Sequence, residues 1–77
     1  MRNKMQYILT GIRKEHGELQ DDLAKMLNIS TAAYRNKEQG KTQFKMDEMF
    51  KIADHYNVKI EDIFLPRKYT LRELERQ

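Results

Sequence analysis

Apolar side chains recur along the chain at the three- and four-residue spacing of amphipathic helices. The first such segment covers residues 4–16, and Arg13 lies on its predicted solvent side. Gly17 follows it and is typical of a residue that ends a helix with positive φ. The expected buried stripe of this helix consists of Met5, Ile8, Leu9 and Ile12.

A second helix is predicted at residues 19–27, with a buried stripe of Leu19, Leu23, Met26 and Leu27. Asp21 and Asp22 lie in its first turn, where the helix dipole favours negative charge. Glu18 is not a preferred N-cap residue, so the start of this helix is expected to be weakly capped.

A third, shorter helix is predicted to begin after Ser30, which is a preferred N-cap residue, and to end at Gly40. Ile29 precedes the cap and Tyr34 follows it at the spacing of a hydrophobic staple. Packing between these two side chains would fix the direction in which the chain enters the helix.

Two further helices are predicted at residues 46–56 and 60–64, with Asn57 as a left-handed stop between them. The expected buried stripe of the fourth helix consists of Met46, Met49, Phe50, Ile52 and Ala53. The sequence therefore predicts an all-α fold: a five-helix domain over residues 1–65, followed by a tail at residues 66–77 that could form a short helix.

Composition narrows the possible functions. The chain has 77 residues, which suits one small domain, and it contains no cysteine, which excludes disulfides and thiolate chemistry. No apolar run exceeds three residues, so neither a membrane span nor a signal peptide is expected, and a cytoplasmic location is predicted. Lys and Arg outnumber Asp and Glu by 15 to 12. The resulting charge of +3 suits an anionic partner.

One side of the third helix carries side-chain types that are able to bind DNA bases. At about 100° per residue, an arc of about 140° contains only small or polar, non-acidic residues. They are Thr31, Ala32, Arg35, Asn36 and Gln39. Arg can bind guanine O6 and N7, and Asn or Gln can bind adenine N6 and N7. Taken alone, the same arc also fits an ordinary solvated helix face.

The surroundings of this helix favour the DNA-binding interpretation. Two short helices joined by about three residues predict a helix-turn-helix, whose second helix enters the major groove. Residues 30–45 also hold four cations, Arg35, Lys37, Lys41 and Lys45, against one acid, Glu38. The excess of 4 − 1 = 3 positive charges suits contacts with phosphates.

The spacing of several residues resembles that of the lambda-repressor/Cro-type, or XRE-like, helix-turn-helix family. The matching residues are Arg13, Gly17, Gln20, Leu23, Ala24, Leu27, Ile29, Ser30, Glu38, Gly40 and Lys41. The resemblance extends to Phe64 and implies a five-helix, lambda-repressor-like domain in which the second and third helices form the helix-turn-helix.

The resemblance also implies roles for individual residues. Gln20 would cap the second helix against a phosphate, and Arg13 would pair with Glu38 to join the first helix to the end of the third. Lys41 and Thr42 would contact the far phosphate backbone. Together with the arc and the charges, the predicted DNA-binding residues are Gln20, Ser30, Thr31, Ala32, Arg35, Asn36, Gln39, Lys41, Thr42 and Lys45.

Several positions depart from the family pattern. Glu18 and Leu19 stand where the family has an apolar residue followed by Ser or Thr, and Leu19 is expected to turn inward. Lys37 replaces an apolar residue, so its stem is expected to pack while its ammonium group reaches solvent. Phe44 stands at a loop position that is often Pro in the family, and Lys45 stands where a helix cap would be expected.

Catalytic and metal-binding functions are not predicted. His16 and His55 lack acidic or cysteine partners at ligand spacing, and the paired acids lie in first turns of helices, where dipole complementation explains them. No cofactor or small-molecule ligand is expected.

Two function classes remain. The favoured one is a sequence-specific regulator that binds double-stranded DNA through the major groove, acting as a repressor of phage, mobile-element or bacterial type. It is expected to bind as a homodimer, because one reading helix covers few base pairs and the family binds in this way. The alternative is a protein-interaction module on the same fold, such as an antitoxin or antirepressor.

Overall fold

Five helices make up most of residues 5–64, the part of the chain that the computed structural model describes. They are α1 (Tyr7–Glu15), α2 (Gln20–Leu27), α3 (Thr31–Glu38), α4 (Met46–His55) and α5 (Ile60–Phe64). The predicted all-α, five-helix domain is confirmed over this range. The predicted tail, including its leucines Leu71 and Leu74, lies outside the described residues.

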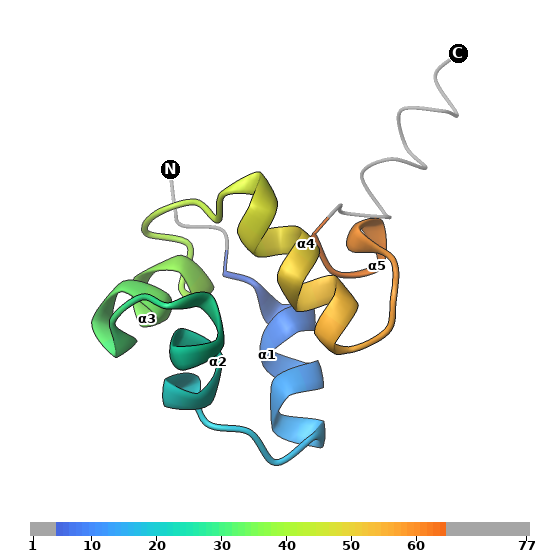
Figure 1. Ribbon diagram of the computed structural model, residues 1–77, viewed down its shortest axis with the longest axis horizontal. Coiled ribbons are helices and arrows are strands. Elements are labelled where there is room, and N and C mark those ends of the chain that lie inside the picture. Colours follow the sequence, from blue (N-terminus) through green and yellow to red (C-terminus); the bar gives the residue numbers. More distant parts are fainter. Residues whose placement is uncertain (1–4, 65–77) are drawn as a thin grey trace.

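The helices are arranged in two groups around α1. In Figure 1, α2 and α3 lie together at one end of the domain, α4 and α5 at the other, and α1 between them. Contacts of α1 with α3 and α5, and of α2 with α4, join the two groups. This arrangement leaves α3 at the outer edge of the domain, attached through α1 and α2.

Residues with positive φ form the tight connections. Gly17 (φ 67°) follows α1 and Asn57 (φ 57°) follows α4, as predicted from the sequence. Asn28 (φ 60°) is the left-handed C-cap of α2 and begins the turn into α3. Asn tolerates this conformation better than most residues that have a side chain, which permits the short connection.

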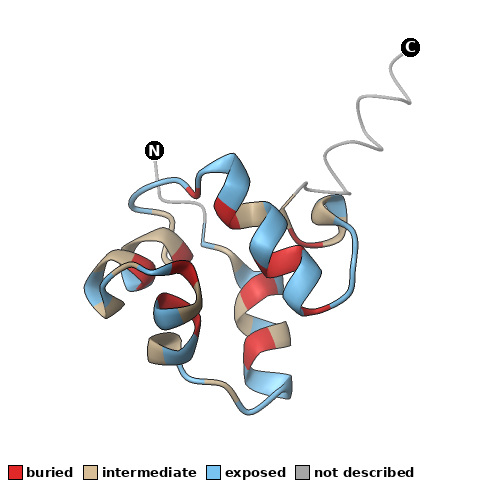
Figure 2. Cartoon of the chain, viewed as in Figure 1, coloured by how far each residue is buried: buried red, intermediate tan, exposed pale blue. Residues whose placement is uncertain are grey.

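The core lies where the helices face one another, as the buried positions in Figure 2 show. Its largest fully buried side chains are Leu9, Leu23, Tyr34 and Ile52. Phe44 extends the core from the α3–α4 connection, with its ring 5.9 Å from that of Tyr34 and 5.4 Å from that of Phe64. An aromatic residue from a loop thus fills the space between the two helix groups.

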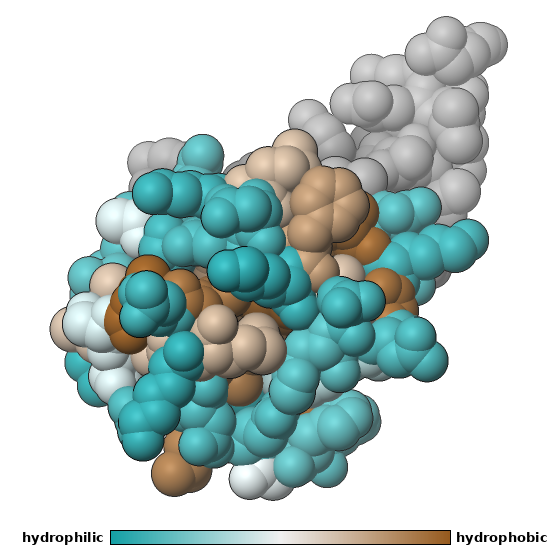
Figure 3. Space-filling model, in the orientation of Figure 1, coloured by the Kyte–Doolittle hydropathy of each residue, from teal (hydrophilic) through white to brown (hydrophobic). Residues whose placement is uncertain are grey.

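The predicted stripe of α4 is partly wrong. Ile52 and Ala53 are buried, but Met46 and Phe50 are 61% and 58% exposed. Glu48 is buried instead, so the inward side of α4 is centred on Ile52 and lies about a third of a turn or more from Met46 and Phe50. On the face shown in Figure 3, apolar side chains gather over α4 and α5 beside hydrophilic neighbours.

The expected stripe of α1 also changes. Leu9 is fully buried and Ile12 packs against the core, but Met5 and Ile8 are 39% and 47% exposed. Arg13, predicted to face solvent, takes the inward position next to Leu9. Its burial has a specific reason, which is a carboxylate on α3.

Leu19 does not turn inward, contrary to the prediction. It is the N-cap of α2 in extended conformation, and the residue is 67% exposed. The side chain of Asp22 accepts a hydrogen bond from the Leu19 backbone N–H at 2.7 Å. Glu48 accepts from Lys45 N–H at 2.8 Å in the same way. Acids three residues after the cap therefore satisfy one donor at the start of each helix, where no cap side chain does.

Candidate nucleic-acid interface

The short helix α3 begins at a side-chain cap. Ser30 Oγ accepts a hydrogen bond from Ala33 N–H at 3.0 Å, which confirms the predicted N-cap. Ile29 packs against the core cluster that contains Tyr34, and the direct staple contact between these two side chains stays a prediction. An eight-residue helix is unstable alone, so these contacts at its start help to hold it in place.

The two sides of α3 differ in burial as the sequence predicts. Tyr34 and Glu38 are buried, whereas Ala32 and Arg35 are exposed. Thr31, Asn36 and Gln39 are of intermediate exposure. All ten predicted DNA-binding residues are at least partly accessible, and none belongs to the core.

A buried carboxylate anchors the end of α3. Glu38 accepts hydrogen bonds from Arg13 Nε at 2.8 Å, Arg13 Nη2 at 3.1 Å and Tyr34 OH at 2.8 Å. Arg13 Nη1 also donates to the Glu18 carbonyl oxygen at 2.8 Å. The expected pair between Arg13 and Glu38 is therefore present, with both side chains almost inaccessible to solvent.

These contacts keep Glu38 ionised. Burial alone would raise the pKa of its carboxyl group, but hydrogen bonds from Arg13, Gln20 and Tyr34 outweigh that effect and lower the pKa. Burial and the neighbouring carboxylate raise the pKa of Tyr34, so its hydroxyl remains a donor. The charge of Glu38 is thus compensated inside the domain and contributes little to the outer side of α3.

Gln20, the first residue of α2, takes part in the same network. Its Nε2 donates to Glu38 Oε1 at 2.9 Å, so one of its two amide hydrogens points into the domain. The second hydrogen of this half-buried amide remains for another acceptor, which leaves the predicted phosphate contact as a prediction.

A contact that sequence reasoning missed lies where α2 meets α3. Thr31 Oγ1 donates to Asp21 Oδ1 at 2.6 Å, and Lys25 Nζ lies 3.3 Å from Asp21 Oδ2. The hydrogen bond from Thr31, followed by the contact with Lys25, lowers the pKa of the Asp21 carboxyl group. The spacing of Asp21 and Lys25 could have predicted their pairing, but no local signal predicts the contact with Thr31.

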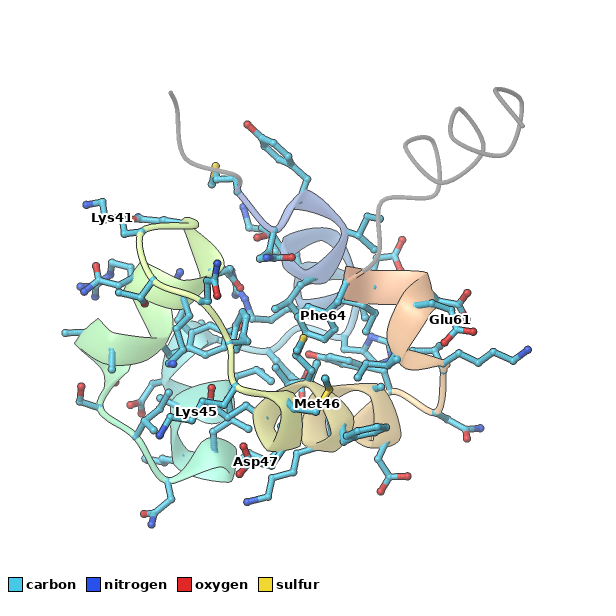
Figure 4. All side chains as sticks on the ribbon, turned by 90° about the horizontal axis from the view of Figure 1, so that it is seen from above. Lys41, Lys45, Met46, Asp47, Glu61 and Phe64 are labelled. Atoms are coloured by element: carbon cyan, nitrogen blue, oxygen red, sulfur yellow. The ribbon has the colours of Figure 1, made fainter. Side chains whose placement is uncertain are left out.

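The connection from α3 to α4 folds back onto α3. The backbone N–H groups of Lys41 and Thr42 donate to the Asn36 carbonyl oxygen at 2.9 and 3.4 Å. Figure 4 shows Lys41 on the outer side of this connection and Lys45 where α4 begins. Both lysines are exposed, and within residues 5–64 neither they nor Arg35 form an ion pair.

The ammonium group of Lys37 does not reach solvent, contrary to the prediction. Its Nζ lies 3.2 Å from Glu48 Oε1, donates to the Gln43 carbonyl oxygen at 3.0 Å and is 5.9 Å from the centroid of the Phe44 ring. The partly buried ammonium remains in the domain because Glu48 compensates its charge. With Lys37 and Glu38 both paired internally, the outward positive charge of residues 30–45 comes from Arg35, Lys41 and Lys45.

Comparison with known proteins assigns the family. A sequence model described as helix-turn-helix matches residues 11–63, which include all five helices in part or whole. The chain belongs to the helix-turn-helix family. The chain is also 42% identical over 65 residues to a protein named as an uncharacterized HTH-type transcriptional regulator of Methanocaldococcus jannaschii. That alignment covers 84% of this chain and 92% of the relative.

The fold of this helix-turn-helix protein is also found in a solved structure. The crystal structure of a transcriptional regulator from Listeria innocua superimposes with a TM-score of 0.73 at 19% identity. The match covers 100% of this chain and 80% of the other. At this identity the likeness shows the fold, and it agrees with the lambda-repressor-like arrangement expected from the sequence.

The described residues of the helix-turn-helix protein offer neither a metal-binding group nor a membrane-spanning helix. In residues 5–64, no group of three or more His, Cys, Asp or Glu side chains is placed to hold a metal ion. His55 Nε2 lies 2.7 Å from Glu18 Oε2, and His16 Nδ1 lies 2.9 Å from the Ile12 carbonyl oxygen, so each histidine has a neighbour within the domain. Over the same range, none of the helices combines the length and apolar character needed to cross a bilayer.

Proposed function

We propose that this protein is a sequence-specific regulator of transcription that binds double-stranded DNA by placing α3 in the major groove. One observation supports this most directly. The outer side of α3 is accessible and free of acidic residues, while the buried pair of Arg13 and Glu38 holds the helix from behind. A recognition helix needs this combination, because base edges are read only by side chains held in a fixed position.

The proposed base contacts come from the outer side of α3. Arg35, Asn36 and Gln39 have forked polar groups that can bind guanine or adenine in the major groove. Thr31 and Ala32 lie at the start of the helix, where small side chains permit close approach and a methyl group can contact thymine.

The proposed phosphate contacts surround that side. Lys41 and Lys45 supply positive charge from the α3–α4 connection, and Thr42 and Ser30 supply neutral polar groups. Gln20 would use its second amide hydrogen. These contacts would position α3 on the duplex without carrying sequence information themselves.

We further propose that the protein binds as a homodimer and acts as a repressor. Two copies of α3 about 34 Å apart would read half-sites one helical turn apart. We propose that the dimer contact is formed by the surface of α5 or by residues after Phe64. The residues after Phe64 lie outside the described part of the chain. Repression by occupying a promoter requires DNA binding alone, whereas activation also requires a contact with the transcription machinery. The phage, mobile-element or bacterial type stays a prediction.

The alternative, a protein-interaction module that uses α3, is less well supported. Within residues 5–64, the large hydrophobic side chains that are exposed lie on α1, on α4, on the connections between helices and on the segment before α1, and none lies on α3. A helix surface that docks another protein usually exposes such side chains.

Selection of binding sites from random duplex DNA, followed by affinity measurements over a salt series, tests the proposal. The expected result is an enriched, two-fold symmetric sequence bound with affinity that falls steeply as salt increases. Absence of both enrichment and salt-dependent binding would refute DNA recognition. An enriched but asymmetric site occupied by a single copy would refute the dimer alone.

A further inference from the structure

A carboxylate lies beside the first residue of α3, at the edge of the proposed interface. Asp21 Oδ1 accepts the hydrogen bond from Thr31 Oγ1 at 2.6 Å, and Asp21 Oδ2 faces Lys25 Nζ at 3.3 Å. The side chains of Asp21 and Lys25 are 49% and 77% exposed, so this group of atoms can reach a bound molecule. Dipole complementation within α2 does not require the contact with Thr31, which belongs to another helix.

The contact restricts what Thr31 can present. A threonine hydroxyl has one hydrogen to donate and can accept two hydrogen bonds. Because the hydrogen is directed to Asp21, only acceptor capacity remains toward the outside. An ionised aspartate is also an acceptor only. The junction of α2 and α3 therefore presents acceptors and a methyl group, and these two side chains have no donor left for a partner.

We propose that Asp21 is a specificity-determining residue, which orients Thr31 so that the pair selects a base edge able to donate a hydrogen bond. In the major groove such donors are adenine N6 and cytosine N4. Guanine presents acceptors at O6 and N7, and thymine presents O4, so both would meet lone pairs on the protein. The inference rests on the proposed function and adds to it a residue of α2, Asp21, that favours bases able to donate a hydrogen bond.

The charge of Asp21 adds a second effect. Apart from Ala33 N–H, which Ser30 caps, the N–H groups at the start of α3 would attract any phosphate, whatever the sequence. A carboxylate beside them, only partly compensated by exposed Lys25, opposes this attraction. Asp21 would thus weaken binding to random DNA more than binding to a site that offers a donor, which increases discrimination.

Four variants test the proposal by selection from random duplexes and by affinity for selected and random DNA. Thr31→Val keeps the shape and methyl group but removes the hydroxyl, and Asp21→Ala removes the orienting acceptor. Asp21→Asn keeps an acceptor for Thr31 while removing the charge and adding a donor. Asp54→Asn, an exposed aspartate near the end of α4, is the matched control. Thermal unfolding of each variant checks that it folds.

At one base-pair position, wild type and Asp54→Asn should select adenine or cytosine on one strand. Thr31→Val and Asp21→Ala should reduce that preference about 3- to 10-fold, the range for one hydrogen bond, and leave other positions unchanged. Asp21→Asn should admit guanine or thymine there and bind random DNA more tightly than wild type.

The outcomes separate this inference from the function on which it rests. If wild type selects a site but Thr31→Val and Asp21→Ala select the same bases at every position with the same strength, Asp21 has no part in recognition and the proposed function stands. If wild type neither enriches a sequence nor binds duplex DNA, the proposed function fails and the inference fails with it.

Discussion

Replacement of Arg13 by methionine should destabilise the domain by about 3 kcal/mol, because it would leave Glu38 charged and buried. The change removes two hydrogen bonds to Glu38, at 2.8 and 3.1 Å, and one to the Glu18 carbonyl oxygen. Breaking a buried ion pair in this way costs about 3–5 kcal/mol. The lower end is expected because Gln20 and Tyr34 would still donate to the carboxylate.

A loss of this size would be a large part of the total free energy of unfolding of the domain. A chain of this length is expected to have a free energy of unfolding of about 4–12 kcal/mol. Urea unfolding of Arg13→Met, Glu38→Leu and the double variant measures the coupling between the two residues. The double variant should recover much of the loss, because an apolar pair leaves no buried charge. If the two single effects add to the double effect within about 0.5 kcal/mol, the pair is not coupled and the reasoning fails.

The pH dependence gives an independent check with a defined sign. In the wild-type domain the pKa of Glu38 is lowered, so its contribution to stability is present above the usual glutamate pKa and is lost as pH falls through the folded value. In Arg13→Met, burial should raise the pKa of Glu38 above its usual value, and protonation at low pH would relieve the penalty. The difference in stability between the two proteins should therefore shrink from neutral pH toward about pH 4. A constant difference would mean that Glu38 does not carry the effect.

Three further predictions concern the interface. Asn36→Ala should weaken binding to the selected site by about 1–3 kcal/mol and relax the preference at one base pair, and an unchanged selected sequence would exclude this role. Lys41→Ala should weaken binding to selected and random DNA alike and reduce the slope of log affinity against log salt by about one phosphate contact. The control Lys59→Ala, which changes an exposed lysine between α4 and α5, should have little effect. A loss of affinity confined to the selected site would contradict the phosphate role of Lys41. Truncation after Pro66 should lower both the stoichiometry on operator DNA, measured by sedimentation, and the affinity, and equal values for the two lengths would exclude the tail as the dimer contact.

The features that could be predicted from the sequence are those set by neighbouring residues. The helix ends at Gly17, Ser30 and Asn57 follow from the conformations and hydrogen bonds available to these residue types, and all three are confirmed. The two sides of α3 also follow from its sequence, because Tyr34 and Glu38 lie one turn apart.

The features that could not be predicted depend on contacts between distant segments. Lys37 is held inward by Glu48 on another helix. Glu48 itself is buried, although the apolar spacing of α4 predicted a buried stripe that does not include it. Apolar residues of α4 cover a wider arc than the small core can bury, so Met46 and Phe50 remain outside. The contact between Asp21 and Thr31 joins two helices across a turn, and neither residue type predicts such a contact.

The single carboxylate of Glu38 accepts hydrogen bonds from residues of α1, α2 and α3. Each of these helices has only eight or nine residues, so none would persist as an isolated peptide in water. A shared acceptor makes their formation interdependent, and α3 cannot unwind at its end without disturbing α1 and α2. Helix α3 is therefore ordered before any partner arrives. Association need not include a folding step for α3, and its conformational entropy is lost during folding of the domain and not during binding.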